Sequence, residues 1–336
     1  MSSNATFWPG VHFNQSYIDF QYNWNHFSTY LAIIPWFYML PSFVIICKIL
    51  KFYKNSEVAS IAMKIDRNVL FVISLSQLIC FCLFFFDFLM VRLPATGIIS
   101  SFCASIAPNH WLKLILFLAL YFTYLAMAFP FLVPVVPILI VLFPNTHNSI
   151  NTKIIHIGVP ILFLYPICFT FYFIPALGIC RQFTFPFPFG SVYIYHYQSA
   201  FGLKNSFFHL YNILFWMTVS IGANVILFCR VVKAKSQLMN KSKTSYRAEF
   251  SITITTISMV ASYVINGTFL IAYISFSGTN SYISYAEVVR PFGNDIQACV
   301  VTWLFYLTHP AFRNSTNSVD TVFSTSSQRR TQRTVS

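Results

Sequence analysis

Two acidic residues lie in apolar surroundings where a carboxylate could do chemistry. Asp87 and Asp295 each sit near one end of a long, otherwise apolar segment. A charge at the centre of a membrane costs about 2.5–3.5 kcal/mol on insertion scales, and less near the interface. Two interpretations stay open. Either the carboxylates reach lipid headgroups or water, or they form the polar floor of an outward-facing ligand cavity, paired with nearby Arg92 or Arg290.

Other residues that could carry catalysis or bind a metal form no constellation in the sequence. The eight histidines are scattered, with no HExxH motif and no pair at helical spacing. Cys80 and Cys82 have the wrong spacing for a zinc site. GxSxG, Walker A and dinucleotide glycine patterns are missing as well. We therefore expect a protein that is not an enzyme and that uses no metal or cofactor.

The eight cysteines divide into two groups. Six lie in or at the end of apolar segments, where packing as a small, soft side chain is the usual role. Cys103 and Cys180 instead fall in two loops on one side of the predicted membrane. If that side is the oxidising exterior, these two can form a disulfide that pins the third helix to the loop covering the bundle. The alternative is two unpaired thiols.

The elements that position these residues are predicted to be membrane-spanning helices. Of the 336 residues, 57% are hydrophobic and only 9% are charged, whereas soluble domains carry about 25% charged residues. Aromatic residues make up 19% of the chain, which excludes intrinsic disorder. A net charge of +13 does not indicate a nucleic-acid-binding protein, because the basic residues lie between apolar runs. Transmembrane β-strands are excluded, because barrel strands alternate apolar and polar residues.

Seven segments are long enough to cross a bilayer, which takes about 20 apolar residues. They lie at about 27–50, 68–90, 111–135, 154–177, 206–230, 249–276 and 291–312. The sequence thus predicts an all-α membrane protein, a seven-transmembrane helix bundle over residues 27–312. Residues 1–26 form an extracellular segment and residues 313–336 a disordered cytoplasmic tail in this interpretation.

The third of these segments is unusually long. It is apolar from Trp111 to Phe143, which would make a straight helix of roughly 50 Å. Pro130, Pro134 and Pro137 lie in its second half, and each removes a backbone donor. We expect the span to end near Val135 and a short bent segment to follow. The alternative is a pair of half-helices that form a re-entrant hairpin.

The distribution of Lys and Arg predicts the orientation of the bundle. Sixteen of the 21 basic residues lie in the first, third and fifth loops and the tail, a side that should be cytoplasmic. The N-terminus is then outside and the C-terminus inside. Asn4 and Asn14 begin glycosylation sequons on the predicted outer segment. The Ser- and Thr-rich tail is either open to phosphorylation or an inert solvated segment.

The fifth loop is the most basic part of the predicted cytoplasmic side. Lys233, Lys235, Lys241 and Lys243 are candidates for a surface that couples to an intracellular partner. The alternative is that these lysines only set the topology and attract anionic lipid, which would account for them fully.

The predicted outer loop at 178–205 is rich in Phe and Tyr. Alternating residues such as Tyr193-Ile194-Tyr195-His196-Tyr197 are typical of a strand. We expect a short hairpin that covers an outer cavity. The alternative is a belt of aromatic side chains at the membrane interface.

Specific stretches of the chain resemble the nematode serpentine chemoreceptors, most closely class U of the gamma superfamily. They are residues 11–20 (VHFNQSYIDF), 34–41 (IPWFYMLP) running into 47–49 (CKI), 67–70 (RNVL) leading to 75–77 (LSQ), and 307–313 (LTHPAFR). The predicted architecture, with seven spans, an outer N-terminus and two outer cysteines, also resembles that of G-protein-coupled receptors. The third span lacks an Asp-Arg-Tyr motif, and the seventh has Thr308-His309-Pro310-Ala311-Phe312 where Asn-Pro-x-x-Tyr would be expected. Coupling to a G protein is therefore a prediction from architecture alone.

The resemblance implies a multi-pass receptor in the plasma membrane or sensory cilium that detects a small-molecule odorant or pheromone. We expect such a ligand to meet the outer thirds of helices two, three, five, six and seven, beneath the loop that bears Cys180. Signalling would pass to an intracellular partner, a heterotrimeric G protein. The rival class is a ligand-gated channel or transporter subunit, which internal repeats would favour; none is visible in the sequence.

Overall fold

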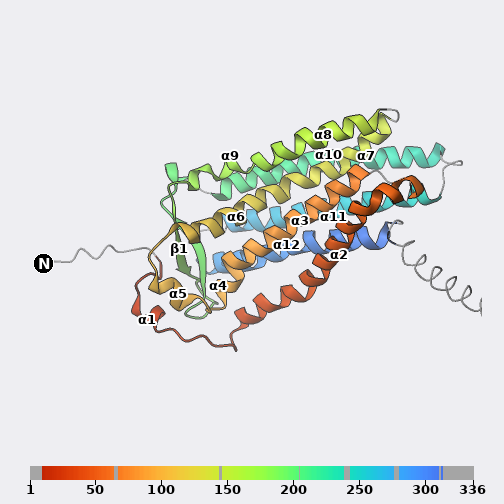
Figure 1. Ribbon diagram of the computed structural model, residues 1–336. Helices are drawn as coiled ribbons and strands as arrows, with labels where there is room; N and C mark the ends of the chain where they lie inside the picture. The colour runs from red at the N-terminus through yellow and green to blue at the C-terminus, as the bar shows by residue number, and fades with distance from the viewer. Residues whose placement is uncertain are drawn as a thin grey trace, which may run out of the picture.

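Long apolar segments can satisfy their backbone hydrogen bonds within a bilayer as helices, and helices dominate the computed structural model (Figure 1). It describes residues 10–63, 67–143, 146–203, 205–237, 243–275, 280–309 and 312. Within these ranges seven long helices run side by side. They are α2 (Phe27–Met63), α3 (Arg67–Asp87), α6 (His110–Ala128), α8 (His147–Leu164), α10 (Asn205–Gln237), α11 (Lys243–Ser275) and α12 (Asn280–Thr308).

Six of the seven helical stretches are long and apolar enough to cross a membrane by length and composition. The seventh, α12, contains Arg290 and Asp295 and is less apolar. It nevertheless packs along α2, α3 and α11 as part of the same bundle. The predicted seven-helix bundle is therefore the observed fold.

The start of the seventh helix was predicted wrongly. We expected it at Pro291, but α12 begins at Asn280 and carries Pro291 in its interior. A proline removes one backbone hydrogen bond without ending a helix when neighbouring helices hold the chain in place. Pro35 and Pro41 lie inside α2 in the same way.

The third helix also continues further than predicted. After α6 the chain makes one 3₁₀ turn, η2 (Phe129–Phe131), and then resumes as α7 (Leu132–Leu142), past the expected end near Val135. Pro130 falls at the start of η2 and Pro134 in the first turn of α7. Backbone N–H groups in a first turn have no partner within the helix, so proline costs little there. The two segments form one rod, not a re-entrant hairpin (Figure 1).

A two-stranded antiparallel hairpin covers one end of the bundle, as the loop sequence predicted (Figure 1). Strand β1 (Leu177–Gln182) pairs with β2 (Val192–Tyr197) in a register that sets Leu177 opposite Tyr197 and Gln182 opposite Val192. Short helices surround it: α1 (Gln15–Ile18), α4 (Leu93–Ala95), α5 (Ser100–Ser105), α9 (Ile167–Thr170), η3 (Phe171–Phe173) and η4 (Ala200–Gly202). We call this the hairpin end.

Buried apolar side chains form two clusters. The larger lies along the middle of the bundle and includes Tyr124, Phe129 and Phe305. The second lies beneath the hairpin and contains both Cys103 and Cys180. Large apolar side chains such as Phe37 and Trp111 are instead 77% and 78% exposed. Such exposed apolar surface fits a protein whose solvent is lipid, where helices associate through packing and hydrogen bonds.

The hairpin docks on the bundle through a glycine. Gly178 of β1 exchanges two backbone hydrogen bonds of 3.1 Å with Asn109, the N-cap residue of α6. A Cβ atom at position 178 would lie 2.2 Å from the backbone nitrogen of Lys113 and 2.5 Å from the carbonyl carbon of Leu112. Only glycine allows β1 to approach the first turn of α6 this closely.

We expect Gly178→Ala to lower the thermal stability of the purified protein, because backbone atoms of α6 would have to move. The cost should be about 1–3 kcal/mol, the usual range for overpacking. A matched control is Gly158→Ala in α8, where a Cβ would meet nothing within 4 Å. The control should be neutral or slightly stabilising, since alanine favours a helix over glycine. Equal melting temperatures for the two variants would contradict this account of the docking.

Candidate ligand site

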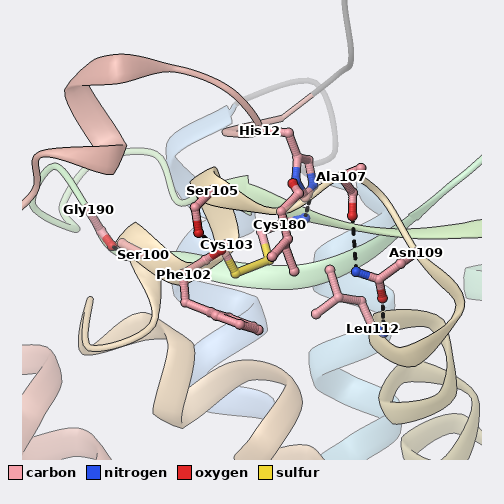
Figure 2. The surroundings of a disulfide bond; sticks show 11 residues. His12, Ser100, Phe102, Cys103, Ser105, Ala107, Asn109, Leu112, Cys180 and Gly190 are labelled. Carbon is pink, nitrogen blue, oxygen red and sulfur yellow. Dashed lines mark hydrogen bonds between the residues drawn. A yellow bond between two sulfur atoms is a disulfide. The ribbon is translucent and has the colours of Figure 1, made fainter.

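A disulfide joins Cys103 and Cys180 at the hairpin end (Figure 2). Cys103 lies in α5 and Cys180 in β1, and both are fully buried. The structure thus brings together the two cysteines that the sequence set apart, and the other six are free. The bond spans a sequence separation of 77 residues. Closing a loop of that size stabilises the folded state by about 4 kcal/mol in the chain-entropy treatment.

His12 holds the N-terminal segment against this disulfide (Figure 2). Its Nδ1 atom lies 2.8 Å from the carbonyl oxygen of Ile106, and its Nε2 accepts a 3.0 Å hydrogen bond from the backbone N–H of Cys180. Because Nε2 accepts, Nδ1 carries the proton and donates, so the ring is neutral with a defined tautomer. Burial lowers the pKa of His12 below its usual value of 6.5, although its backbone hydrogen bonds act in the opposite direction.

A cavity of about 340 Å³ lies beneath the hairpin. Strand β2 covers it with Tyr193, Tyr195 and His196, and η3 contributes Phe173. The remaining walls come from η1 (Phe88–Arg92), the π-helical turn that continues α3, and from α6, α10, α11 and α12. These are the helix ends and the loop at which the sequence led us to expect a ligand.

The cavity lining is mainly apolar and includes a few polar groups. Apolar lining residues are Met90, Val91, Leu116, Leu120, Phe207, Phe269, Leu270 and Ile274. The polar lining residues include Asn205, His209 and Arg290. Such a mainly apolar wall with a few fixed polar groups is the usual composition of a small-molecule site.

Hydrogen bonds from two tyrosines fix the Asn205 amide. Its Oδ1 accepts from the hydroxyl of Tyr124 at 2.8 Å and from that of Tyr172 at 3.1 Å. The group that Asn205 can still offer inside the cavity is therefore its amide nitrogen, a donor.

Two ion pairs connect η1 and the end of α3 to α12 in a crossed arrangement. Arg92 Nη2 donates to Asp295 Oδ2 at 2.7 Å, and Arg290 Nη2 donates to Asp87 Oδ1 at 3.3 Å. In each helix the acid and the arginine are five residues apart, in opposite order along the chain. Breaking a buried pair by removing one partner costs about 3–5 kcal/mol, because the other charge stays buried.

A tyrosine and two aromatic rings complete the deeper pair. Tyr38 of α2 donates a 2.5 Å hydrogen bond to Asp295 Oδ2. The Arg92 guanidinium lies over the rings of Phe84 and Phe292, at 5.4 and 4.7 Å from their centroids. Three helices, α2, α3 and α12, therefore meet at one buried charge cluster.

The structure corrects both interpretations of the two aspartates. The side chains of Asp87 and Asp295 are only 5% and 4% exposed, so neither reaches water or headgroups. Neither lines the cavity, so they are not its floor. Pairing with Arg92 and Arg290 does occur, but across helices: each aspartate pairs with the arginine of the other helix. The lining residue is Arg290, and Asp87 lies behind it.

The remaining candidate residues lie far apart. Asn14 is exposed and caps α1, its side chain accepting from the backbone N–H of Ser16 at 3.0 Å. Asn4 and Lys241 lie outside the described residues, as does the tail from residue 313. Lys233 and Lys235 belong to the last turns of α10, and Lys243 begins α11. These ends of α10 and α11 lie away from the hairpin (Figure 1).

Sequence reasoning missed His12, Tyr38 and Asn205. A single polar residue carries no mark of its partner in the sequence, so composition could not have selected them. One signal was available: the spacing of five residues between acid and base recurs at Asp87–Arg92 and, reversed, at Arg290–Asp295. Two such pairs in reversed order on antiparallel helices favour an exchange of partners.

Comparison with known proteins identifies the family of the chain. Residues 11–315 match the family described as "Serpentine type 7TM GPCR chemoreceptor Sru". The chain is 34% identical over 264 residues to "Serpentine receptor class U-26" of Caenorhabditis elegans, covering 76% of this chain and 88% of that protein. The chain therefore belongs to the Sru family of serpentine seven-transmembrane chemoreceptors, a family of receptors and of multi-pass membrane proteins.

The contact of His12 with the hairpin should weaken in acid. Because burial lowers its pKa below 6.5, the imidazole binds a proton more readily when the segment is undocked. Docking is thus fully favourable above pH 6.5 and weakens as the pH falls below that value. Hydrogen-exchange protection factors of residues 11–18, corrected for intrinsic rates, should fall between pH 7 and pH 5.

Two variants control this measurement. His12→Gln should show low protection at both pH values, whereas His26→Asn, which changes a histidine outside this contact, should keep the pH dependence. A pH dependence that persists in His12→Gln would show that another group is responsible.

Proposed function

We propose that the cavity beneath the hairpin is the ligand site of a chemosensory receptor. Its volume, its mainly apolar lining and its cover of tyrosines suit a small odorant or pheromone. Family membership supports a chemoreceptor, and the cavity is the observation that carries the proposal. The polar groups at Asn205 and Arg290 would orient the bound molecule.

The hairpin end faces the outside of the cell in this proposal. Supporting it are the excess of Lys and Arg in the loops at the other end, the sequons at Asn4 and Asn14, and the disulfide, which persists in an oxidising environment. Residues 1–26 are then extracellular, residues 27–312 form the receptor domain and residues 313–336 a cytoplasmic tail. The receptor would reside in the plasma membrane, including that of a sensory cilium.

Helix α12 would carry the signal to the cytoplasmic side. At the hairpin end its Ser284 hydroxyl accepts a 2.9 Å hydrogen bond from the backbone N–H of Thr184, beside the hairpin. At the other end its Thr308 lies 2.5 Å from Ser251 of α11. A ligand that favours one arrangement of α12 over another would shift the population of two helix packings.

The partner at the cytoplasmic end would be a heterotrimeric G protein. The surface offered to it would include Lys233 and Lys235 of α10, Lys243 of α11, and Lys241 between the two helices. Architecture supports this partner, and the motifs of rhodopsin-like receptors are absent from the corresponding sequence positions.

A ligand screen in reporter cells tests the site. We expect at least one small volatile or pheromone-like compound to evoke a response that Leu116→Trp abolishes, because the indole would occupy the cavity. The matched control is Leu114→Trp on the same helix, whose side chain is 42% exposed and does not line this cavity. The control should respond like the unchanged receptor. Equal responses of both variants, at equal surface expression, would contradict a ligand site in this cavity.

Glycosidase treatment tests the orientation. The glycosylated receptor should shift in gel mobility on treatment, and the double variant Asn4→Gln/Asn14→Gln should not, because both acceptors would be lost. Asn314→Gln is the control, since its sequon lies on the predicted cytoplasmic side, and it should leave the shift intact. A shift that remains in the double variant would remove this support for an outer N-terminus.

A further inference from the structure

We infer that the cavity binds small organic acids, with an aliphatic or aromatic body against the apolar wall and a single carboxylate on Arg290. This inference rests on the proposed function and adds the chemical class of the ligand. It depends on three features of the described residues: the charge of the lining, the position of Asp87 and the donors that face a ligand.

The described part of the cavity lining carries a cation. Among the lining residues that the structure describes, Arg290 is the one Lys or Arg and none is Asp or Glu. A guanidinium presents several N–H donors in one plane, a geometry that matches the two oxygens of a carboxylate.

Asp87 does not close off Arg290 from the cavity. The Arg290 side chain is 22% exposed, against 5% for its partner Asp87, so the arginine lies in front and the acid behind. Their contact of 3.3 Å is longer than the 2.7 Å contact of Arg92 with Asp295. Because Arg290 lines the cavity and Asp87 does not, a ligand carboxylate in this inference meets Arg290 from the cavity and leaves Asp87 in place.

Hydrogen-bond donors reinforce the preference for an anion. The amide nitrogen of the lining residue Asn205 is a donor, because its oxygen already accepts from Tyr124 and Tyr172. The lining also includes Leu116, Leu120 and Leu270, which offer apolar contact for a hydrocarbon body. A ligand that fits this lining has an acceptor group at its head and an apolar body, which is the composition of an organic acid.

Affinity selection with mass spectrometry tests this class directly. The full chain would be held in phosphatidylcholine nanodiscs, which carry no net lipid charge, at pH 7.4. The probes are hexanoic, decanoic, phenylacetic and indole-3-acetic acids, each beside its methyl ester. We expect at least one acid to be retained at least tenfold more than its ester, and Leu116→Trp to remove that retention.

Matched double variants separate the role of Arg290 from stability. Asp87→Asn/Arg290→Gln removes the cation of the cavity without leaving a buried charge, and acid and ester should then be retained equally. Arg92→Gln/Asp295→Asn removes the neighbouring pair, which does not line the cavity, and should keep the preference. Arg290→Lys retains the charge should the double variant fail to fold, and it should keep a weaker preference for the acid.

The outcomes distinguish the ligand class from the ligand site. Equal retention of acids and esters, both lost in Leu116→Trp, would overturn the acid preference and leave the site intact. An acid preference that persists in Asp87→Asn/Arg290→Gln would also overturn it. Failure to retain any probe, or retention that Leu116→Trp does not change, would count against both this inference and the cavity as the ligand site.

Discussion

The core of a bilayer contains no water, so a polar group buried there must find its partner inside the protein. In this receptor that constraint concentrates on α12, the least apolar of the long helices. Its Asp295 is bound by Arg92 and Tyr38, and further along Thr302 donates to Gln77 at 2.8 Å. The helix that composition identifies least readily as a span is thus joined by hydrogen bonds and ion pairs to α2, α3, α6 and α11. Packing of α2, α3 and α11 follows from those connections.

At the hairpin end a second set of constraints gives the cavity its shape. The disulfide between Cys103 and Cys180 and the close approach of Gly178 to α6 hold the hairpin in place. Thr184, in the loop between the two strands, also contacts Ser284 of α12. The hairpin that covers the cavity is therefore attached to the same helix that contributes Arg290 to the cavity wall. Arg290 on that helix faces the cavity and contacts Asp87 behind it. A change at the cavity therefore acts on the same helix that connects the bundle.

Much of the fold could be predicted because membrane-spanning helices are recognisable in a sequence as long apolar runs. A run of some 20 apolar residues has few alternatives in lipid, so the number of helices and their order followed from composition. Element boundaries were harder, as at Val135 and Pro291. Proline predicts the end of a helix at both places, but a 3₁₀ turn and the support of neighbouring helices let the chain continue. Those compensations depend on neighbours that a linear pattern does not contain.

For the site, the sequence by itself determined which residues are unusual for their surroundings and so are candidates for a structural or functional role. Charges in apolar segments, cysteines in loops and the aromatic loop at 178–205 all stand out from their surroundings. Which partner each one has was decided only by the tertiary structure. Asp87 pairs with Arg290 and not with Arg92, which is nearer in the sequence. Helix packing brings Asp87 and Arg290, 203 positions apart, to within hydrogen-bonding distance. The sequence shows that a charge in an apolar segment is costly to bury. Which group pairs with that charge, and so offsets the cost, depends on how the helices pack.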